Sequence, residues 1–226
     1  MLINFFGKRG AGKTTAINGQ LQDCRGPVIV CDVLGNYLNK GYIEKSSTAD
    51  AILWIEAWIK NPDQENKILV LQCADPNLSV DFMSAALWES GQGTLILDET
   101  DAFSIHEAEC FDQLIRYGRN RNIDLITGVR RPAEIPRNIT AGANQIYAFQ
   151  TQEPRDVDYF RTTLFGSRAD ELMVLQEFHG LFLDYDRKEI GEFRIDKNGT
   201  IFKLKIEPIN KTAPRKTEPQ TRFEGV

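Results

Sequence analysis

Eight residues near the N-terminus carry the strongest chemical signal in this sequence. Residues 7–14 read Gly-Lys-Arg-Gly-Ala-Gly-Lys-Thr and match G-x-x-x-x-G-K-[ST] at every fixed position. Such a loop points backbone N–H groups at phosphate oxygens, and the following helix N-terminus adds partial positive charge. We expect Lys13 to reach the β- and γ-phosphates of ATP and Thr14 to ligate Mg²⁺. The residues predicted to hold the nucleotide are Gly7, Lys8, Arg9, Gly10, Ala11, Gly12, Lys13, Thr14 and Thr15.

A pair of acidic residues supplies the second half of this chemistry. Asp98 and Glu99 directly follow the apolar run at residues 94–97, which is typical of a Walker B strand. We predict that Asp98 joins Thr14 at the metal and that Glu99 orients and deprotonates the attacking water. The alternative is that the two acids only cap the next helix. Taken with the loop at 7–14, they indicate hydrolysis of the bound nucleotide.

The elements that must position these residues alternate along the chain. Continuously apolar strands separated by helices indicate a parallel sheet covered on both faces. The order of the two motifs, with another strand between them, predicts an α/β fold with a RecA-like P-loop NTPase core. The predicted strands are 2–6, 27–31, 68–72, 94–97, 123–127 and 145–149, and the predicted helices are 13–22, 48–60, 79–90, 105–120, 154–164 and 168–176.

The pattern changes in the last fifty residues. Residues 178–183, 190–195 and 200–206 read as strands, and Asn198-Gly199 is a strong hairpin signal. We expect a small antiparallel edge on the main sheet or a flap beside it. Residues 207–226 are Pro-rich and polar, which is typical of a flexible tail. The predicted organisation is an ATPase domain over 1–206, with the hairpin extension at 178–206, and a tail at 207–226.

Composition narrows the possible functions. The 226 residues are 42% hydrophobic and 26% charged, which suits a globular protein with a sizeable core. No run approaches the ~18 apolar residues of a membrane span, so we expect none. Four cysteines without C-x-x-C spacing and two separated histidines do not indicate a zinc site. A net charge of −5 argues against a globally basic nucleic-acid coat, so any DNA contact must be local.

An arginine-rich segment stands out in this acidic chain. Residues 116–137 hold six arginines against Asp124 and Glu134, a local net charge of +4. Oligomeric ATPases often complete their site with an arginine from a neighbouring subunit, and the candidates are Arg116, Arg119 and Arg121. Three further arginines flank Pro132 and Pro136 and are expected on a loop that binds DNA phosphates regardless of sequence: Arg130, Arg131 and Arg137. The finger candidates could instead lie on a solvated helix face or form surface salt bridges. The DNA candidates could instead form salt bridges to acidic residues of another subunit.

Three segments resemble the FtsK/HerA superfamily of DNA-pumping ATPases. Residues 118–132 contain Gly-Arg-x-x-x-Ile-x-Leu-Ile and then Arg-Arg-Pro, similar to the family's G-R-x-x-G-I-x-L segment and the strand ending T-Q-R-P. Residues 138–149 look like its next strand. Residues 31–37 (Cys-Asp-Val-Leu-Gly-Asn-Tyr) resemble its D-P-x-G-E-Y turn. The resemblance covers roughly residues 1–183.

This resemblance implies a homo-oligomeric ring, a pentamer or hexamer, that threads double-stranded DNA, with Arg119 as the arginine finger. Three residues depart from the family pattern: Arg130 replaces the usual Gln sensor, Asn122 the second glycine, and Asn36 an acidic residue. With neither a membrane region nor a winged-helix reader expected, the chain is most similar to the genome-packaging ATPases of membrane-containing, tailless double-stranded DNA viruses and phages. The implied partner is a capsid vertex or portal protein, in the host cytoplasm or at the packaging vertex of the virion.

Other functions fit parts of the pattern. A Zot-like phage-assembly ATPase shares this core but usually carries a membrane span. A small-molecule or nucleotide kinase has the same loop but needs no glutamate after the Walker B aspartate. A nucleotide switch needs N-K-x-D, and residues 39–42 (Asn-Lys-Gly-Tyr) lack the Asp. DNA-stimulated ATP hydrolysis distinguishes the motor from these alternatives.

Overall fold

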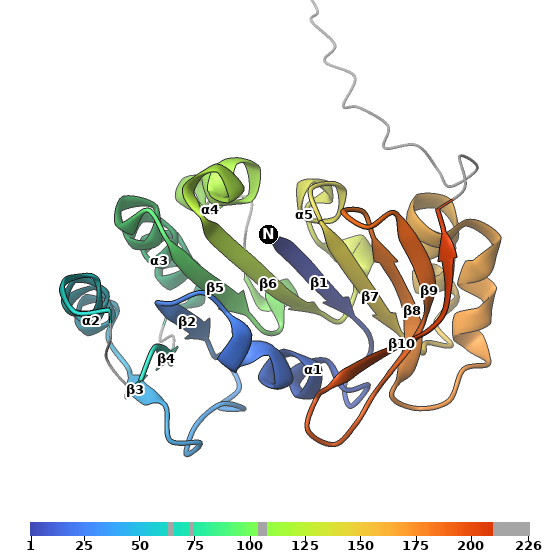
Figure 1. Ribbon diagram of the computed structural model, residues 1–226, viewed down its shortest axis with the longest axis horizontal. Coiled ribbons are helices and arrows are strands. Elements are labelled where there is room, and N and C mark those ends of the chain that lie inside the picture. The colour runs from blue at the N-terminus through green and yellow to red at the C-terminus, as the bar shows by residue number, and fades with distance from the viewer. Residues whose placement is uncertain (63–65, 73–74, 104–107, 210–226) are drawn as a thin grey trace, which may run out of the picture.

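In the computed structural model, which describes residues 1–62, 66–72, 75–103 and 108–209, one sheet runs through the molecule (Figure 1). Its strand order is β10-β9-β8-β7-β1-β6-β5-β2-β4-β3. The strands are β1 (Leu2–Phe6), β2 (Val28–Cys31), β3 (Ile43–Lys45), β4 (Ile68–Leu71), β5 (Gly93–Leu97), β6 (Ile123–Val129), β7 (Gln145–Phe149), β8 (His179–Asp184), β9 (Glu189–Ile195) and β10 (Ile201–Pro208).

The strands from β7 to β3 are parallel and form the P-loop core. β1 pairs with β7 on one side and with β6 on the other, and β6 pairs with β5. One strand therefore separates the strand before residues 7–14 from the strand before Asp98, as predicted. All parallel strands end at the same edge of the sheet, so both motifs meet at that edge.

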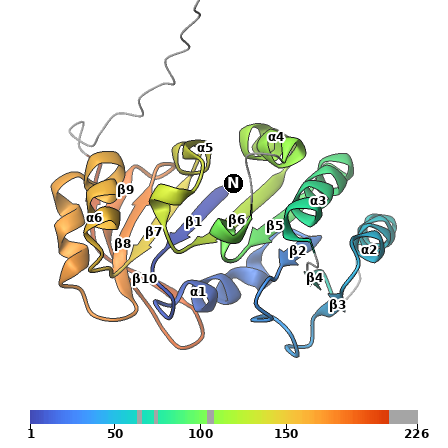
Figure 2. The ribbon, with the colours of Figure 1, turned by 180° about the vertical axis from the view of Figure 1, so that it is seen from behind.

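Helices cover both faces of the sheet, as Figures 1 and 2 show from opposite sides. Among the described residues, α1 packs on one face and the other five α-helices pack on the opposite face. The helices are α1 (Lys13–Gln20), α2 (Thr48–Lys60), α3 (Pro76–Ser90), α4 (Glu109–Tyr117), α5 (Arg137–Ala141) and α6 (Pro154–Phe160). Within the described residues, no helix is long and apolar enough to cross a bilayer.

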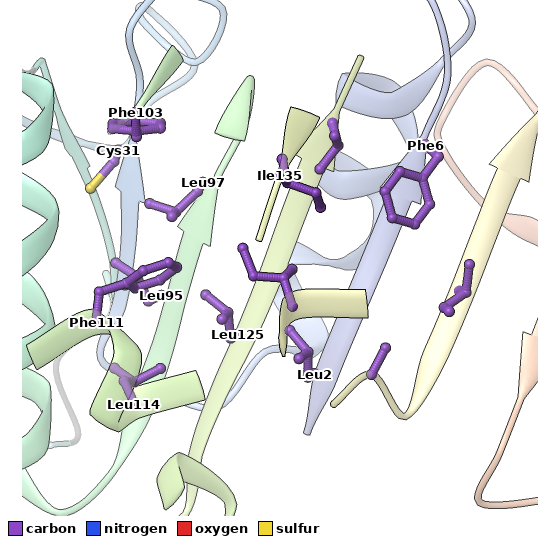
Figure 3. Packing of buried hydrophobic residues seen from close by; sticks show 14 of the residues in the cluster. Leu2, Phe6, Cys31, Leu95, Leu97, Phe103, Phe111, Leu114, Leu125 and Ile135 are labelled. Atoms are coloured by element: carbon purple, nitrogen blue, oxygen red, sulfur yellow. The ribbon is translucent and has the colours of Figure 1, made fainter. Parts of the chain in front are cut away.

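Two hydrophobic cores result from the alternation of side chains along each strand. In β5, Leu95 and Leu97 face the five-helix side, whereas Ile96 faces α1. Figure 3 shows the larger core, where Phe111 of α4 and Phe6 of β1 are fully buried. Uninterrupted apolar runs are therefore needed in strands buried on both faces, and this is why the sequence predicts them well.

The C-terminal strands extend the sheet rather than form a separate flap. β8 pairs antiparallel with β7, β9 with β8, and β10 with β9. The β9–β10 turn is held by the Asp196 carboxylate, which accepts from the backbone N–H groups of Asn198 and Thr200 at 2.9 Å. Gly199 in this turn has φ 83°, a left-handed conformation that favours glycine. The predicted tail at 207–226 lies, from residue 210 onward, outside the described residues.

Some element boundaries differ from the prediction for local reasons. α3 begins at Pro76 rather than 79, because Asp75 accepts from Leu78 N–H as the N-cap and proline suits the first helical position. The helix predicted at 154–164 is α-helical only to Phe160 and continues as a π-helical turn. The helix predicted at 168–176 is instead a 3₁₀ helix over Gly166–Met173. β3 and α5 are too short to show a period. Positions 105–107 of one predicted helix lie outside the described residues.

Candidate active site

The loop at residues 7–12 connects the end of β1 to the start of α1. Gly10 and Gly12 have φ angles of 80° and 108°, which L side chains rarely adopt. Lys13 begins α1 and is 4% exposed, and its Nζ donates to the backbone oxygens of Gly7 at 2.9 Å and Lys8 at 3.3 Å. Burial lowers the pKa of Lys13, and the carboxylates of Glu99 and Asp98 act in the opposite direction. The structure thus places a buried ammonium against the inner carbonyls of a curled loop, a geometry that fits a phosphate chain.

Thr14 and Asp98 are brought together across the edge of the sheet. The Thr14 hydroxyl donates to Asp98 Oδ2 at 2.5 Å. Asp98 follows β5 directly and is 2% exposed. A hydroxyl and a carboxylate side by side fit the needs of Mg²⁺, which takes few protein ligands and completes its octahedron with water and phosphate oxygens.

Tyr37 also belongs to this site, although no role there was predicted for it. Its hydroxyl donates to the same Asp98 oxygen at 3.1 Å, and the residue is fully buried. The pKa of Tyr37 is raised well above its ordinary value by burial and by the Asp98 carboxylate, so the hydroxyl keeps its proton. Its position depends on Asp32, whose carboxylate accepts from the backbone N–H groups of Asn36 at 3.0 Å and Tyr37 at 2.8 Å. The resemblance of residues 31–37 to the D-P-x-G-E-Y turn was the sequence signal that could have pointed to Tyr37.

Glu99 adopts a special backbone conformation beside the metal ligands. Its φ of 60° is left-handed, which is uncommon for a glutamate. Its side chain makes no cap hydrogen bond to the 3₁₀ turn at Thr100–Ala102, and Asp98 is engaged with Thr14, so helix capping does not account for the acidic pair. Burial raises the pKa of Glu99, while Lys13 and Arg130 act to lower it.

Arg130 forms an ion pair with the Glu99 carboxylate. Its Nε lies 2.8 Å from Glu99 Oε2 and 2.9 Å from Asp101 Oδ2. The resemblance placed Arg130 where the family has a neutral Gln sensor. The arginine here contacts the predicted base directly, so a charged guanidinium lies beside Glu99 at this position.

Gly128 of β6 makes room for Asp98. A Cβ added at Gly128 would lie 2.3 Å from Asp98 Oδ1 and 3.2 Å from Ile17 Cδ1. Any side chain at this position would therefore displace the carboxylate that Thr14 and Tyr37 hold. This role of Gly128 could not be predicted from local pattern, because the contact joins two neighbouring strands.

Comparison with known proteins identifies the fold. The genome packaging NTPase B204 from Sulfolobus turreted icosahedral virus 2, in complex with AMPPCP, superposes with a TM-score of 0.67 at 17% identity, covering 84% of this chain and 95% of that chain. The DNA-packaging ATPase B204 from Sulfolobus Turreted Icosahedral Virus gives 0.64 at 17% identity, with the same coverage. The chain has the fold of a P-loop NTPase. No protein-family profile matches the sequence, and no curated protein matches it significantly.

The expected resemblance to packaging ATPases is confirmed at the level of this fold. Within the same P-loop fold, the AMP complex of B204 from the second virus covers 90% of this chain at a TM-score of 0.65 and 18% identity. The match spans nearly all of each B204 chain, so the likeness concerns the whole domain and not only the nucleotide loop.

Arg119 lies at the far edge of the P-loop fold from Lys13. It sits in a 3₁₀ turn at Gly118–Arg121, just before β6 begins, whereas Lys13 follows the end of the parallel neighbour β1. The seven residues of β6 separate these edges by roughly 20 Å. Asn122 has φ 56°, so it adopts the left-handed conformation expected where the family has glycine. Arg119 could therefore complete only the site of another subunit.

The three candidate finger arginines differ in how firmly they are held. Arg116 Nε contacts Asp112 at 2.6 Å, and the Arg121 guanidinium lies 4.7 Å from the Trp88 ring centre. Arg119 is 72% exposed and has a long contact of 3.8 Å with Asp186. Arg119 is therefore the most readily available of the three for a neighbour.

The candidate DNA arginines are engaged within the chain. Arg130 and Arg131 lie in the loop after β6, as expected, and Arg131 Nη1 contacts Asp156 at 3.2 Å and Glu153 at 3.5 Å. With Lys8 and Arg9 they line a cavity of about 640 Å³. Arg137 was expected on this loop, which was wrong: Pro136 ends the loop and Arg137 starts α5. Proline is compatible with the position before a helix, because the backbone there donates no hydrogen bond within the helix.

Proposed function

We propose that this chain is an ATP-driven double-stranded DNA translocase that works as a viral genome-packaging motor. The proposal depends on one observation: the side chains of Lys13, Thr14, Asp98 and Glu99 lie together at one edge of the sheet. The Thr14 hydroxyl donates a hydrogen bond to Asp98 at 2.5 Å. The fold likeness to two viral proteins, one described as a genome packaging NTPase and the other as a DNA-packaging ATPase, supports the DNA-related part.

The side chains divide the hydrolysis between them. Lys13 neutralises the terminal phosphates of ATP, and Thr14 and Asp98 would hold Mg²⁺. Mg²⁺, when bound, offsets the negative charge that develops on the phosphates. Glu99 accepts a proton from the attacking water, and its raised pKa makes it a stronger base than an exposed glutamate.

The remaining cation comes from a second copy in a ring of five or six subunits. Arg119 of one subunit reaches the terminal phosphate held by Lys13 of the next, since the two residues lie at opposite edges of each chain. Such completion in trans ties hydrolysis to assembly and lets subunits act in turn.

DNA contacts in this proposal use Arg130, Arg131 and Arg137. Phosphates of the DNA backbone compete with Glu153 and Asp156 for Arg131, which is 46% exposed and therefore accessible. Binding of this type is independent of sequence and weakens with salt. A capsid vertex or portal protein then anchors the ring, in the host cytoplasm or at the packaging vertex.

The test is ATP hydrolysis with and without double-stranded DNA. We expect DNA to stimulate turnover, and Arg131→Ala combined with Arg137→Ala to reduce the stimulated rate more than the basal rate. The matched control is Arg161→Ala with Arg187→Ala, which removes two other exposed, ion-paired arginines. Equal loss of basal and stimulated rates would argue against DNA contact. A monomer that transfers phosphate to a nucleoside would instead establish the kinase alternative.

A further inference from the structure

Phe178 occupies the edge of the sheet that carries the phosphate loop. It directly precedes β8, which runs antiparallel to β7, so the start of β8 lies beside the end of β7 and near residues 7–12. The Phe178 carbonyl accepts from Ile195 N–H at 3.0 Å, which ties this residue to the end of β9. Phe178 therefore has a fixed backbone position close to the candidate site.

The Phe178 ring lies against the loop while remaining open to solvent. A Cβ added at Gly12 would lie 3.0 Å from Phe178 Cδ1 and 2.7 Å from Ile195 Cδ1. Even so, Phe178 is 45% exposed, whereas Ile195 is buried. Its φ of 62° is a strained conformation for an aromatic residue, and such strain concentrates at functional positions.

The strand order decides which part of a nucleotide lies near Phe178. Asp98 and Glu99 follow β5, which is on one side of β1, so the terminal phosphate points toward that side. The first phosphate, the ribose and the base must then leave on the other side of β1, toward β7 and β8. Phe178 lies on that side and next to Gly12.

The β9–β10 turn closes this side of the site. A Cβ added at Gly199 would lie 2.0 Å from Thr15 O, and one added at Gly19 would lie 2.5 Å from Gly199 O. The turn is therefore packed backbone to backbone on α1, directly against Thr15, the last of the residues predicted to hold the nucleotide. This contact fixes Phe178 and Ile195 relative to the loop.

We propose that the exposed face of Phe178 is the platform on which the base of the bound nucleoside triphosphate stacks. This inference rests on the proposed function, because it names the base subsite of the same nucleotide. Stacking on an aromatic ring does not read the hydrogen-bonding edge of a base. Phe178 therefore contributes affinity for nucleotides over phosphate alone, with little preference between adenine and guanine.

The experiment compares binding of ATP, GTP and inorganic tripolyphosphate to the full chain. Phe178→Ala is expected to weaken the binding of ATP and of GTP by about tenfold each, which is within the affinity range that one base–aromatic stack contributes. Tripolyphosphate binding stays unchanged, because it lacks a base. Phe178→Trp keeps the affinity of the wild type, and Phe178→Leu, which keeps apolar volume without a π face, loses most of it.

The matched control is Phe202→Ala, which removes another half-exposed phenylalanine, from β10, where it packs against Arg194. We expect it to leave all three affinities unchanged. The proposal is overturned if Phe178→Ala leaves ATP binding intact or weakens tripolyphosphate equally. Failure of the wild-type chain to bind any of the three ligands would instead refute the proposed nucleotide site itself.

Discussion

Removing the Tyr37 hydroxyl tests whether the site geometry around Asp98 is correct. Tyr37→Phe keeps the fully buried ring and deletes only the donor 3.1 Å from Asp98 Oδ2. A buried hydrogen bond to a charged group contributes about 1.5–3 kcal/mol, and in a domain of this size that corresponds to roughly 4–10 °C in the unfolding midpoint. A partner that orients a metal ligand is also worth about 10- to 100-fold in metal affinity. Tyr37→Phe should therefore lower both quantities.

The assay is a Mg²⁺ titration of ATPase activity at saturating ATP, together with thermal unfolding without metal. Tyr147→Phe is the matched control, because that hydroxyl is also 3.1 Å from its acceptor, Gln145 Oε1, on β7. The control should lose about 1 kcal/mol of stability, as a neutral bond does, and keep its Mg²⁺ dependence. Equal Mg²⁺ dependence in the two variants would refute the assignment of Tyr37 to the Asp98 site.

Two further substitutions act on the same carboxylates. Glu99→Gln should reduce turnover by about 10²–10⁴-fold while ATP binding persists; comparable turnover would remove Glu99 as the base. The pKa of Glu99 is raised above its ordinary 4.5, so its ionisation lowers stability above that pH, and the variant should unfold at a higher temperature at pH 7 but not below pH 4.5. Gly128→Ala should displace Asp98 and weaken Mg²⁺ activation, at a stability cost of about 1–3 kcal/mol from overpacking; an unchanged Mg²⁺ titration would contradict the 2.3 Å approach.

The parts of the fold that depend on local sequence pattern could be predicted. β1 and β7 match the prediction at both ends, as does α2, where Ser47 accepts from Asp50 N–H as the N-cap. Apolar runs and caps are encoded within a few neighbouring residues. β3 has only three residues, of which Glu44 is exposed, and α5 has only five residues, so neither element is long enough for its apolar spacing to predict it.

The residues of the candidate site could be predicted where a motif specifies both residue type and spacing. Lys13, Thr14, Asp98 and Glu99 meet as expected because a loop after one strand and an acid after a nearby parallel strand share an edge. Tyr37 and Phe178 belong to that edge through long-range contacts, to Asp98 and to Gly12. The turn at residues 31–37 was a signal for Tyr37, whereas no local pattern encodes the contact of Phe178.

The position of Arg119 links the chemistry of one chain to the geometry of an assembly. Lys13 lies at the carboxyl edge of the parallel strands and Arg119 at the amino edge, so no movement of side chains within one chain can bring them together. If Arg119 completes a site, the amino edge of one subunit must face the carboxyl edge of the next. That head-to-tail contact is not self-complementary, and it closes only as a ring or continues as a filament. The placement of these two residues on one sheet therefore supports the proposed ring, and Arg119→Ala should reduce turnover only in the assembled form.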